Sequence, residues 1–298
     1  MTSVVSLLPS GTEWVYALGR DGSLAGVTFE CDHPSAARSR HPIVVHGMPT
    51  DGLTPGQIDA AVRARIERGE PLYRLDTDAL TRIAPDVVIT QDLCAVCALP
   101  AGDVATAIDR VGCPSRLVTL DPHRLDDVLD GAVEVAAALG NESAGRRLRG
   151  ELGARLESVA SRVRGRERPR VLVLEWTDPP FLAGHWVPDM VAAAGGQVLL
   201  AEPGERSAST GWPAVGAVDP DITVVAPCGF GLPSAIEYGR AVLDRLPSAS
   251  SVWAVDAGAF VTRPGPRVVD GVEALAHVLH PDAVPAPPQG RVARLRPF

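Results

Sequence analysis

Residues 143–165 read SAGRRLRGELGARLESVASRVRG and carry the most distinctive pattern of the chain. Apolar side chains recur there at intervals of three or four positions, at Leu148, Leu152, Leu156, Val159 and Val163. This spacing places them on one face of an α-helix, which would be roughly 34 Å long at 1.5 Å per residue. Because the segment lies near the middle of 298 residues, we predict that it is a rigid helix connecting two halves.

Alternating strand and helix patterns flank this helix on both sides. Predicted strands cover 4–8, 24–28, 86–90, 116–120, 170–174, 222–226 and 252–255, and predicted helices cover 10–19, 56–68, 75–84, 126–139, 187–194, 233–246 and 268–279. Ser10 and Glu13 have the spacing of a capping box, so Ser10 is the expected N-cap of the first helix. Alternation of this kind predicts α/β lobes with mostly parallel sheets.

The expected architecture is therefore two Rossmann-like α/β lobes joined by one long rigid helix, with a ligand cleft between the lobes. Its predicted parts are an N-terminal lobe at 1–142, the helix at 143–165, a C-terminal lobe at 166–282 and a tail at 283–298. Each lobe has the roughly 100–150 residues that one hydrophobic core needs. The tail is rich in proline and arginine, and we expect it to be disordered or loosely attached.

Composition excludes several classes of function. The formal net charge is −8, which argues against nucleic acid as a partner. All 28 basic residues are arginine, so Schiff-base and P-loop lysine chemistry are impossible. No apolar run is long enough to span a membrane, and the N-terminus has no basic n-region. We therefore expect a cytoplasmic protein without membrane insertion, in which the five cysteines do not form a disulfide framework.

Ligands of parallel α/β sheets bind at the carboxyl ends of the strands, and most of the unusual side chains fall there. The predicted ligand-binding residues are Ser10, Glu30, Asp32, His33, Asp92, Glu175, Trp176, His185, Trp186, Phe230 and Phe260. Trp176 and Trp186 offer flat faces for a large planar ligand, or they belong to the core. His185 either contacts the ligand or caps the helix that begins near Pro188.

Four cysteines are predicted near strand ends, and they define a candidate metal site: Cys31, Cys94, Cys97 and Cys228. Four thiolates suit zinc or an iron–sulfur cluster. The Cys94–Cys97 spacing alone is also typical of a redox or structural pair. Cys113 precedes a strand, and we expect it to be a buried small hydrophobe. No hydrolase elbow, dinucleotide loop or zinc-protease helix is present, so no catalytic residue is assigned.

Residues 6–13, SLLPSGTE, followed by a helix ending at Gly19 and by LAGVT at 24–28, resemble the opening of the cobalamin-binding proteins of ABC importers. These are class III periplasmic-binding-protein-like receptors for metal chelates, with a helical backbone. The order of lobe, helix and lobe resembles them over 1–282. The resemblance implies a receptor that holds a corrinoid, haem, siderophore or metal between lobes. An ABC permease is its implied partner only if a signal sequence has been removed.

Five further motifs resemble a branch of that family that has cysteines and no signal peptide. They are ECDHP at 30–34, DLCAVC at 92–97, EW at 175–176 with AGHWVP at 183–188, PCGF at 227–230 and RPGPR at 263–267.

Two functions follow from these observations. The first is a binding protein for cobalamin or another metal chelate, and the second is a cytoplasmic metalloenzyme with a zinc or iron–sulfur centre. The lack of an identifiable acid, base or nucleophile with a partner favours the binding protein.

Overall fold

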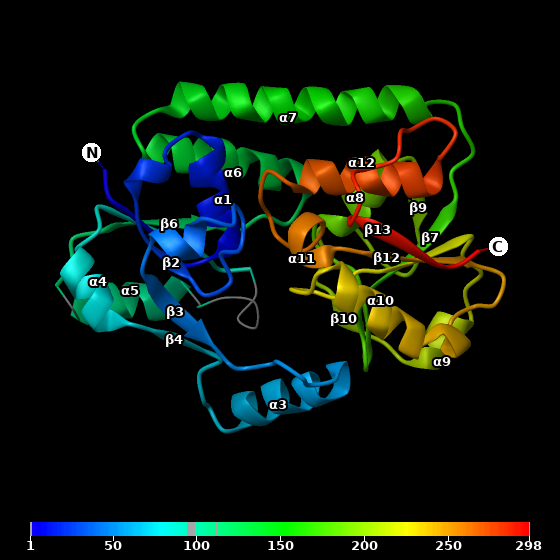
Figure 1. The fold of residues 1–298 in the computed structure, drawn as a ribbon, viewed down its shortest axis with the longest axis horizontal. Helices are drawn as coiled ribbons and strands as arrows, with labels where there is room; N and C mark the ends of the chain where they lie inside the picture. Colours follow the sequence, from blue (N-terminus) through cyan, green and yellow to red (C-terminus); the bar gives the residue numbers. More distant parts are fainter. Residues whose placement is uncertain (1, 94–98, 100, 111, 298) are drawn as a thin grey trace. The chain divides into compact units, whose positions relative to one another are not determined.

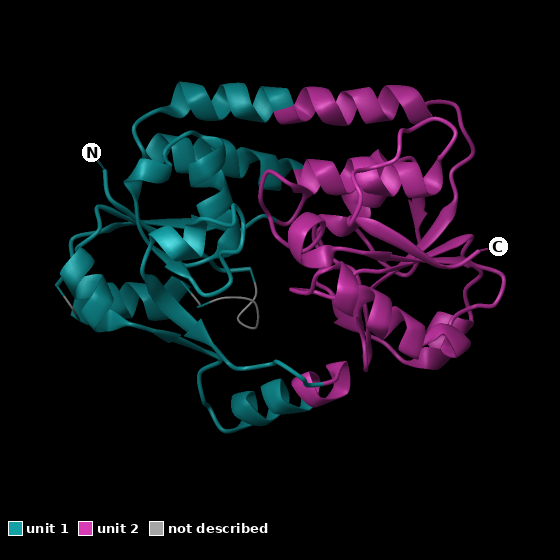
Figure 2. Cartoon of the chain, in the orientation of Figure 1, with its two compact units in different colours: residues 1–53, 60–122, 126–151 teal, residues 54–59, 123–125, 152–298 magenta. Residues whose placement is uncertain are grey.

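The computed structural model describes residues 2–93, 99, 101–110 and 112–297 (Figure 1). The chain divides into two compact units, which Figure 2 shows in different colours. Unit 1 comprises Met1–Leu53, Ala60–Pro122 and Asp126–Glu151, and unit 2 comprises Thr54–Asp59, His123–Leu125 and Leu152–Phe298. Among the described residues, no helix is both long and apolar enough to cross a membrane.

Unit 1 contains a six-stranded sheet in the order β4-β3-β2-β1-β5-β6. Its strands are β1 (Val4–Ser6), β2 (Leu24–Thr28), β3 (Ile43–Gly47), β4 (Tyr73–Leu75), β5 (Val87–Gln91) and β6 (Arg116–Leu120). All neighbouring strands are parallel except β3 and β4. The neighbouring interior strands β1 and β5 are buried along their whole length, as strands inside parallel sheets usually are.

Helices follow most strands of unit 1. They are α1 (Pro9–Ala17), η1 (Asp21–Ser23), α2 (Ala37–Arg40), α4 (Thr77–Ile83), α5 (Ala101–Arg110) and α6 (Leu125–Ala138). A further helix, α3 (Pro55–Glu67), begins within the residues of unit 2 and continues into those of unit 1. The core of unit 1 includes Val5, Leu7, Val44, Leu80 and Val88.

The start of α1 differs from the prediction. Leu8 is its N-cap, Pro9 occupies the first turn, and no side chain caps the helix. Ser10 lies inside the helix and is buried, so the predicted capping box at Ser10 is wrong. The physical reason is Pro9, because its fixed φ and missing N–H suit the first helical position and begin the helix one residue earlier.

Unit 2 contains a seven-stranded sheet in the order β10-β8-β7-β11-β12-β13, with β9 also paired to β7. Its strands are β7 (Arg170–Thr177), β8 (Pro180–Leu182), β9 (Gln197–Val198), β10 (Ala208–Ser209), β11 (Ile222–Val225), β12 (Ser251–Val255) and β13 (Val292–Arg296). The three central strands, β7, β11 and β12, are parallel to one another. The first half of β7 pairs with β9, and its second half pairs with β8.

The helices of unit 2 are α8 (Val187–Ala193), α9 (Trp212–Gly216), α10 (Leu232–Ala241), η2 (Leu243–Arg245), α11 (Ala257–Phe260) and α12 (Val268–Leu279). The long amphipathic pattern is a single helix, α7 (Glu142–Val163), of 22 residues. Its residues up to Glu151 belong to unit 1, and those from Leu152 onwards belong to unit 2. The two-unit α/β fold with mostly parallel sheets and one long helix is thus the predicted fold.

The C-terminal segment is not the loose tail that its composition predicts. Residues Val292–Arg296 form β13, which pairs antiparallel with β12. Arg296 donates hydrogen bonds to the backbone carbonyls of Leu243, Pro247 and Ser250, and the Arg294 guanidinium lies 5.2 Å from the ring centroid of Trp253. The prediction is wrong here because these arginines pair with carbonyls and a ring, although their composition alone is typical of a solvated segment.

Candidate functional site

The sheet of unit 2 has a topological switch point between β7 and β11. The chain leaves β7 to form β8 and β9 along one edge, and it returns to form β11 along the other edge. Crevices at such points, outside the carboxyl ends of the strands, are the usual ligand sites of open α/β sheets. The loops that follow β7, β11 and β12 are therefore the first place to look for a site.

Three aromatic rings cluster at this position. The centroid of the Trp176 ring, at the end of β7, lies 5.7 Å from that of Phe230, which follows β11. Tyr238, on α10, lies 5.5 Å from Phe230 and 6.5 Å from Trp176. Trp176 and Phe230 are half-buried, whereas Tyr238 is buried. The pKa of Tyr238 is raised, chiefly by burial and then by the charge of Glu237. The aromatic cluster Trp176–Phe230–Tyr238 therefore rests on a buried ring and exposes part of two others.

Polar contacts fix the orientation of Trp176. Its indole N–H is 3.1 Å from the carbonyl oxygen of Asp178 and 3.3 Å from that of Pro55, at the start of α3. Both acceptors are backbone groups of unit 2. The indole N–H is thus satisfied within the protein, and the apolar part of the ring is left for other contacts.

Main-chain hydrogen bonds join the three loops into one body. The Cys228 N–H donates to the Glu175 carbonyl at 2.9 Å, and the Gly258 N–H donates to the Phe230 carbonyl at 2.8 Å. The Gly229 N–H lies 3.4 Å from the Thr262 hydroxyl oxygen. Because each loop is bonded to its neighbour, the position of Phe230 depends on the loop after β12 as well as on its own.

Glu175 and His185 are the polar residues of unit 2 predicted to bind a ligand. Glu175 is 9% exposed, and its carboxylate accepts a hydrogen bond from the Ser207 hydroxyl. His185 has a φ of +53°, a conformation that non-glycine residues seldom adopt. Its backbone N–H donates to the Glu205 carbonyl at 2.6 Å, and its ring lies 6.3 Å from that of His123. His185 is half-buried and precedes α8 without capping it.

Trp186 and Phe260 lie in the interior of unit 2. Trp186 is 4% exposed, and its indole N–H donates to the Val261 carbonyl at 2.7 Å. Phe260 is 9% exposed, and the guanidinium groups of Arg267 and Arg291 lie 5.5 and 4.6 Å from its ring centroid. Trp186 therefore belongs to the core, which was one of the two alternatives for the tryptophans, whereas Trp176 lies in the candidate site.

The predicted residues of unit 1 differ in exposure. Ser10 is buried, and its hydroxyl has no hydrogen-bond partner among the described atoms. Glu30 is half-buried, whereas Asp32, His33 and Asp92 are exposed. Glu30 follows the carboxyl end of β2, and Asp92 follows that of β5. The candidate residues of unit 1 are therefore small or charged, without an aromatic cluster like that of unit 2.

The cysteine prediction is only partly within the described residues, since Cys94 and Cys97 lie outside them. Cys31 is buried, and its sulfur lies 3.1 Å from the Thr12 hydroxyl oxygen and 3.6 Å from that of Thr28. Cys228 is half-buried. Within the part of the chain that the structure describes, no group of three or more His, Cys, Asp or Glu side chains is placed to hold a metal ion. The four-thiolate centre stays a prediction.

Cys113 is buried as expected, with its sulfur 3.1 Å from the Ser115 hydroxyl oxygen.

Tyr238 is a residue of the candidate site that the sequence analysis does not predict, although the chain has only three tyrosines. A signal was available, because Tyr238 stands eight positions after Phe230 in the helix that follows the PCGF motif.

Comparison with known proteins agrees with the fold of this chain. The model of the periplasmic binding protein family matches residues 4–264. The apo form of a periplasmic heme-binding protein from Roseiflexus sp. RS-1 is similar with a TM-score of 0.70 and 23% identity, covering 95% of this chain and 99% of that one. The periplasmic vitamin B12 binding protein of Vibrio cholerae has a TM-score of 0.66 and 20% identity, covering 93% and 96%.

A periplasmic heme-binding protein from Pseudomonas aeruginosa gives a TM-score of 0.70 at 19% identity, over 100% of this chain and 98% of that one. No curated protein sequence matches this chain. The structural likenesses establish the fold, and the family match covers most of both units. This chain belongs to the periplasmic binding protein family.

Proposed function

We propose that this protein binds a tetrapyrrole metal chelate, a corrinoid or a heme, and that the aromatic cluster Trp176–Phe230–Tyr238 contacts the ligand. The observation that carries the proposal is the position of this cluster at the switch point of the unit 2 sheet. Similar structures are those of heme-binding and vitamin B12 binding proteins. They favour this ligand class over a sugar or an amino acid.

Physical chemistry supports a large, partly apolar ligand. The half-buried Trp176 and Phe230 would gain about 25 cal/mol for each Å² of apolar surface that a ligand removes from water. Stacked or edge-to-face contacts with a conjugated ring add about 0.5–1.5 kcal/mol. Glu175 supplies a hydrogen-bonding group near the carboxyl end of β7, and His185 supplies another just before the start of α8. Such groups suit the polar periphery of a corrinoid or the carboxylates of a heme.

An ABC permease is the partner that this function implies, and it remains a proposal together with the cellular location. The metalloenzyme alternative depends on Cys94 and Cys97, which lie outside the described residues. No observation in the described residues favours that alternative, so we do not propose it as the function.

Titration of the purified protein with hydroxocobalamin and with hemin tests the proposal, with the ligand's absorption spectrum and calorimetry as readouts. We expect saturable binding of at least one of them. Trp176→Ala should raise its Kd about tenfold or more, since a lost stacking contact and its buried area are worth about 1–3 kcal/mol. The circular dichroism of this variant should not change.

Trp253→Ala is the matched control. Trp253 is also half-buried and lies in unit 2, but it stands within β12 and contacts Arg294 instead of the aromatic cluster. Its substitution should leave the Kd within about twofold, because distant residues without shared partners usually act independently. Failure of both compounds to bind would contradict the proposal, and so would equal effects of the two substitutions.

A further inference from the structure

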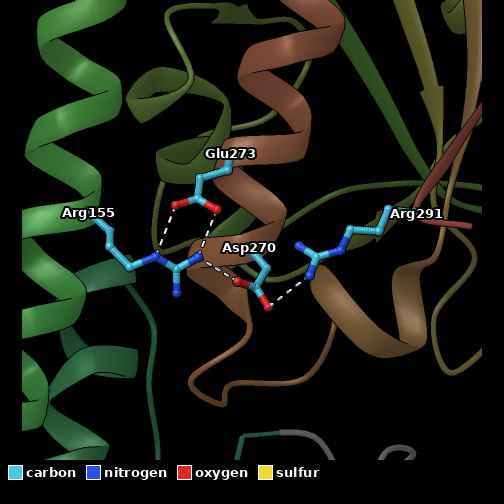
Figure 3. A network of polar contacts seen from close by, with 4 residues as sticks. All are labelled: Arg155, Asp270, Glu273 and Arg291. Atoms are coloured by element: carbon cyan, nitrogen blue, oxygen red, sulfur yellow. Dashed lines mark hydrogen bonds and ion pairs between the residues drawn. The ribbon is translucent and has the colours of Figure 1, made fainter. Parts of the chain in front are cut away.

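Four charged side chains of unit 2 form a network of polar contacts (Figure 3). Arg155, on α7, makes a bidentate contact with Glu273, at 2.9 and 2.7 Å, and a further contact of 2.5 Å with Asp270. The other carboxylate oxygen of Asp270 lies 3.6 Å from the Arg291 guanidinium. Two positive and two negative charges therefore balance, and Asp270 is shared between both arginines.

Burial makes this network more than a surface ion pair. The four side chains are between 19% and 40% exposed, so water screens their charges only in part. The pKa of Arg155 is raised above its usual value, first by the hydrogen bond to Glu273 and also by Asp270. Arg155 and Glu273 fix α7 against α12, whereas Arg291 extends the network to the C-terminal segment before β13.

Arg291 contacts the loop after β12 in two ways. Its carbonyl oxygen accepts a hydrogen bond of 3.0 Å from the Asp256 N–H. Its guanidinium lies 4.6 Å from the ring centroid of Phe260, which closes the same loop. One residue thus holds both the beginning and the end of α11, through its backbone and its side chain.

Close backbone packing leaves this loop little freedom to move elsewhere. Gly271, on α12, follows Asp270 directly, and a Cβ atom at this position would lie 2.0 Å from the Phe260 carbonyl oxygen. Such an approach is possible only for glycine. Asp270 therefore pairs with Arg291, and the adjacent Gly271 allows the Phe260 backbone to pack closely against α12.

The loop 256–262 in turn fixes the position of Phe230 in the aromatic cluster. The Gly258 N–H donates to the Phe230 carbonyl at 2.8 Å, and the Phe230 ring contacts Trp176 at 5.7 Å between centroids. A continuous path of contacts thus leads from Arg291 through α11 to the aromatic cluster.

We propose that Arg291 is a positioning residue for ligand binding: it sets the loop 256–262 and, through it, the position of Phe230. This inference rests on the proposed function, because it assigns Arg291 a role at the same site. Arg291, Asp270 and Glu273 all lie beyond residue 264, where the family match ends. The positioning device therefore belongs to the C-terminal segment of this chain.

Arginine suits the two contacts at this position better than lysine does. A planar guanidinium stacks on an aromatic ring while its edge donates to a carboxylate, whereas an ammonium group does only one of these well. Lysine at position 291 would keep the charge beside Asp270 and lose the planar contact with Phe260. Methionine would keep a flexible apolar stem and lose both.

Arg291→Met and Arg294→Met form a matched pair for the test. Arg294 lies on β13 and also stacks on an aromatic ring, that of Trp253, but it does not contact the loop 256–262 in the described contacts. Hydroxocobalamin and hemin are the ligands used. Arg291→Met should raise the Kd of the ligand that binds about tenfold, whereas Arg294→Met should leave it within about twofold. Arg291→Lys should give an intermediate Kd.

Hydrogen exchange provides a readout that needs no ligand. In Arg291→Met, and less so in Arg291→Lys, amides of 227–231 and 256–262 should exchange at least about threefold faster, because their local opening free energy falls. Arg294→Met should leave these amides unchanged. If Arg291→Met does not fold, the comparison of Arg291→Lys with Arg294→Met decides in the same way.

The outcomes separate the two proposals. If neither ligand binds the unsubstituted protein, the proposed function fails, and the exchange data still decide whether Arg291 positions the loop. The inference is overturned if the Arg291 variants and Arg294→Met exchange amides of 227–231 and 256–262 at the same rates. It is also overturned if the unsubstituted protein binds a ligand and the Arg291 variants bind that ligand with the same Kd as Arg294→Met.

Discussion

In unit 2 the strands beside the switch point, β7 and β11, lead into Trp176 and Phe230, whose rings contact each other. In unit 1 the corresponding strands are β1, which leads into α1 with Pro9 in its first turn, and β5, which leads into Asp92. These two pairs of strands thus lead into flat apolar side chains in unit 2 and into small or charged ones in unit 1, whose aromatic pair, Phe29 and Tyr73, lies at β2 and β4 instead. We infer that unit 2 supplies the surface that recognises the apolar face of a ligand.

The two units also differ in how tightly backbone packs against backbone near these ends. A Cβ atom at Gly271 of unit 2 would meet a backbone oxygen, that of Phe260. A Cβ atom at Gly11 of unit 1 would meet the side chains of Ser6 and Ile89, at 2.7 and 2.9 Å. Side chains can adjust to an added methyl group more easily than backbone can, so α12 at Gly271 should tolerate the group less well than α1 at Gly11.

The largest expected effect comes from adding a methyl group at these two glycines. Gly271→Ala should lower the free energy of unfolding by about 3 kcal/mol, the upper end for overpacking, because a backbone carbonyl blocks the site. Gly11→Ala should cost less than Gly271→Ala, since its neighbours are side chains and alanine favours a helix by about 1 kcal/mol over glycine. Urea denaturation followed by circular dichroism measures both, and equal losses would refute this contrast in packing.

A second, smaller effect separates the two tryptophans of unit 2. Trp186→Phe should cost about 1–3 kcal/mol of stability, because the buried Val261 carbonyl loses its donor. Its effect on ligand affinity should be smaller than that of Trp176→Phe, because Trp186 acts only through the loop 256–262. Trp176→Phe should change stability by about 0.5 kcal/mol or less, as half-exposed positions usually do, and weaken binding. Thermal melting and ligand titration distinguish them, and the reverse pattern would place the ligand at Trp186.

The smallest expected effect concerns acid and unit 1. Burial lowers the pKa of His41, which lies 3.5 Å from the Tyr16 hydroxyl. The folded protein therefore binds a proton less readily than the unfolded chain, whose histidine has its usual pKa near 6.5. Stability should fall as the pH drops below this value, towards the lower pKa of the folded state.

His41→Gln should remove this contribution. Its unfolding free energy should depend less on pH between about 7.5 and 5.5 than that of the unsubstituted protein. Urea titrations at several pH values check the prediction. An unchanged slope would show that His41 does not carry the acid sensitivity.

Much of the fold could be predicted because its signals are local. The spacing of Leu152 and Val159 defines α7, and apolar runs define the central strands. The predicted strand at 116–120 and helix at 268–279 coincide with β6 and α12. The strands β3, β4, β8, β9, β10 and β13 were not predicted. In β4, β8, β9 and β10, two or three residues give too little periodicity to distinguish a strand from a loop.

The site could be predicted only in part. Trp176 and Phe230 stand next to strand ends in the sequence, so their position followed from topology alone. Trp186 carries the same local signal, and only tertiary packing shows that its indole N–H is bound in the interior. Arg291 gave no signal, because its partners Asp256, Phe260 and Asp270 are distant in sequence and its own segment has the composition of a disordered tail.

Amide hydrogen exchange of the protein with and without hydroxocobalamin or hemin, whichever binds, tests the contrast between the units most directly. The account predicts the strongest protection in the loops of unit 2, at 175–178 and 227–231, and weaker protection at 28–33 of unit 1. Protection is expected there because a ligand that removes amides from water and ties loops together slows their opening. Protection confined to unit 1, with the loops around Trp176 and Phe230 unchanged, would contradict the account.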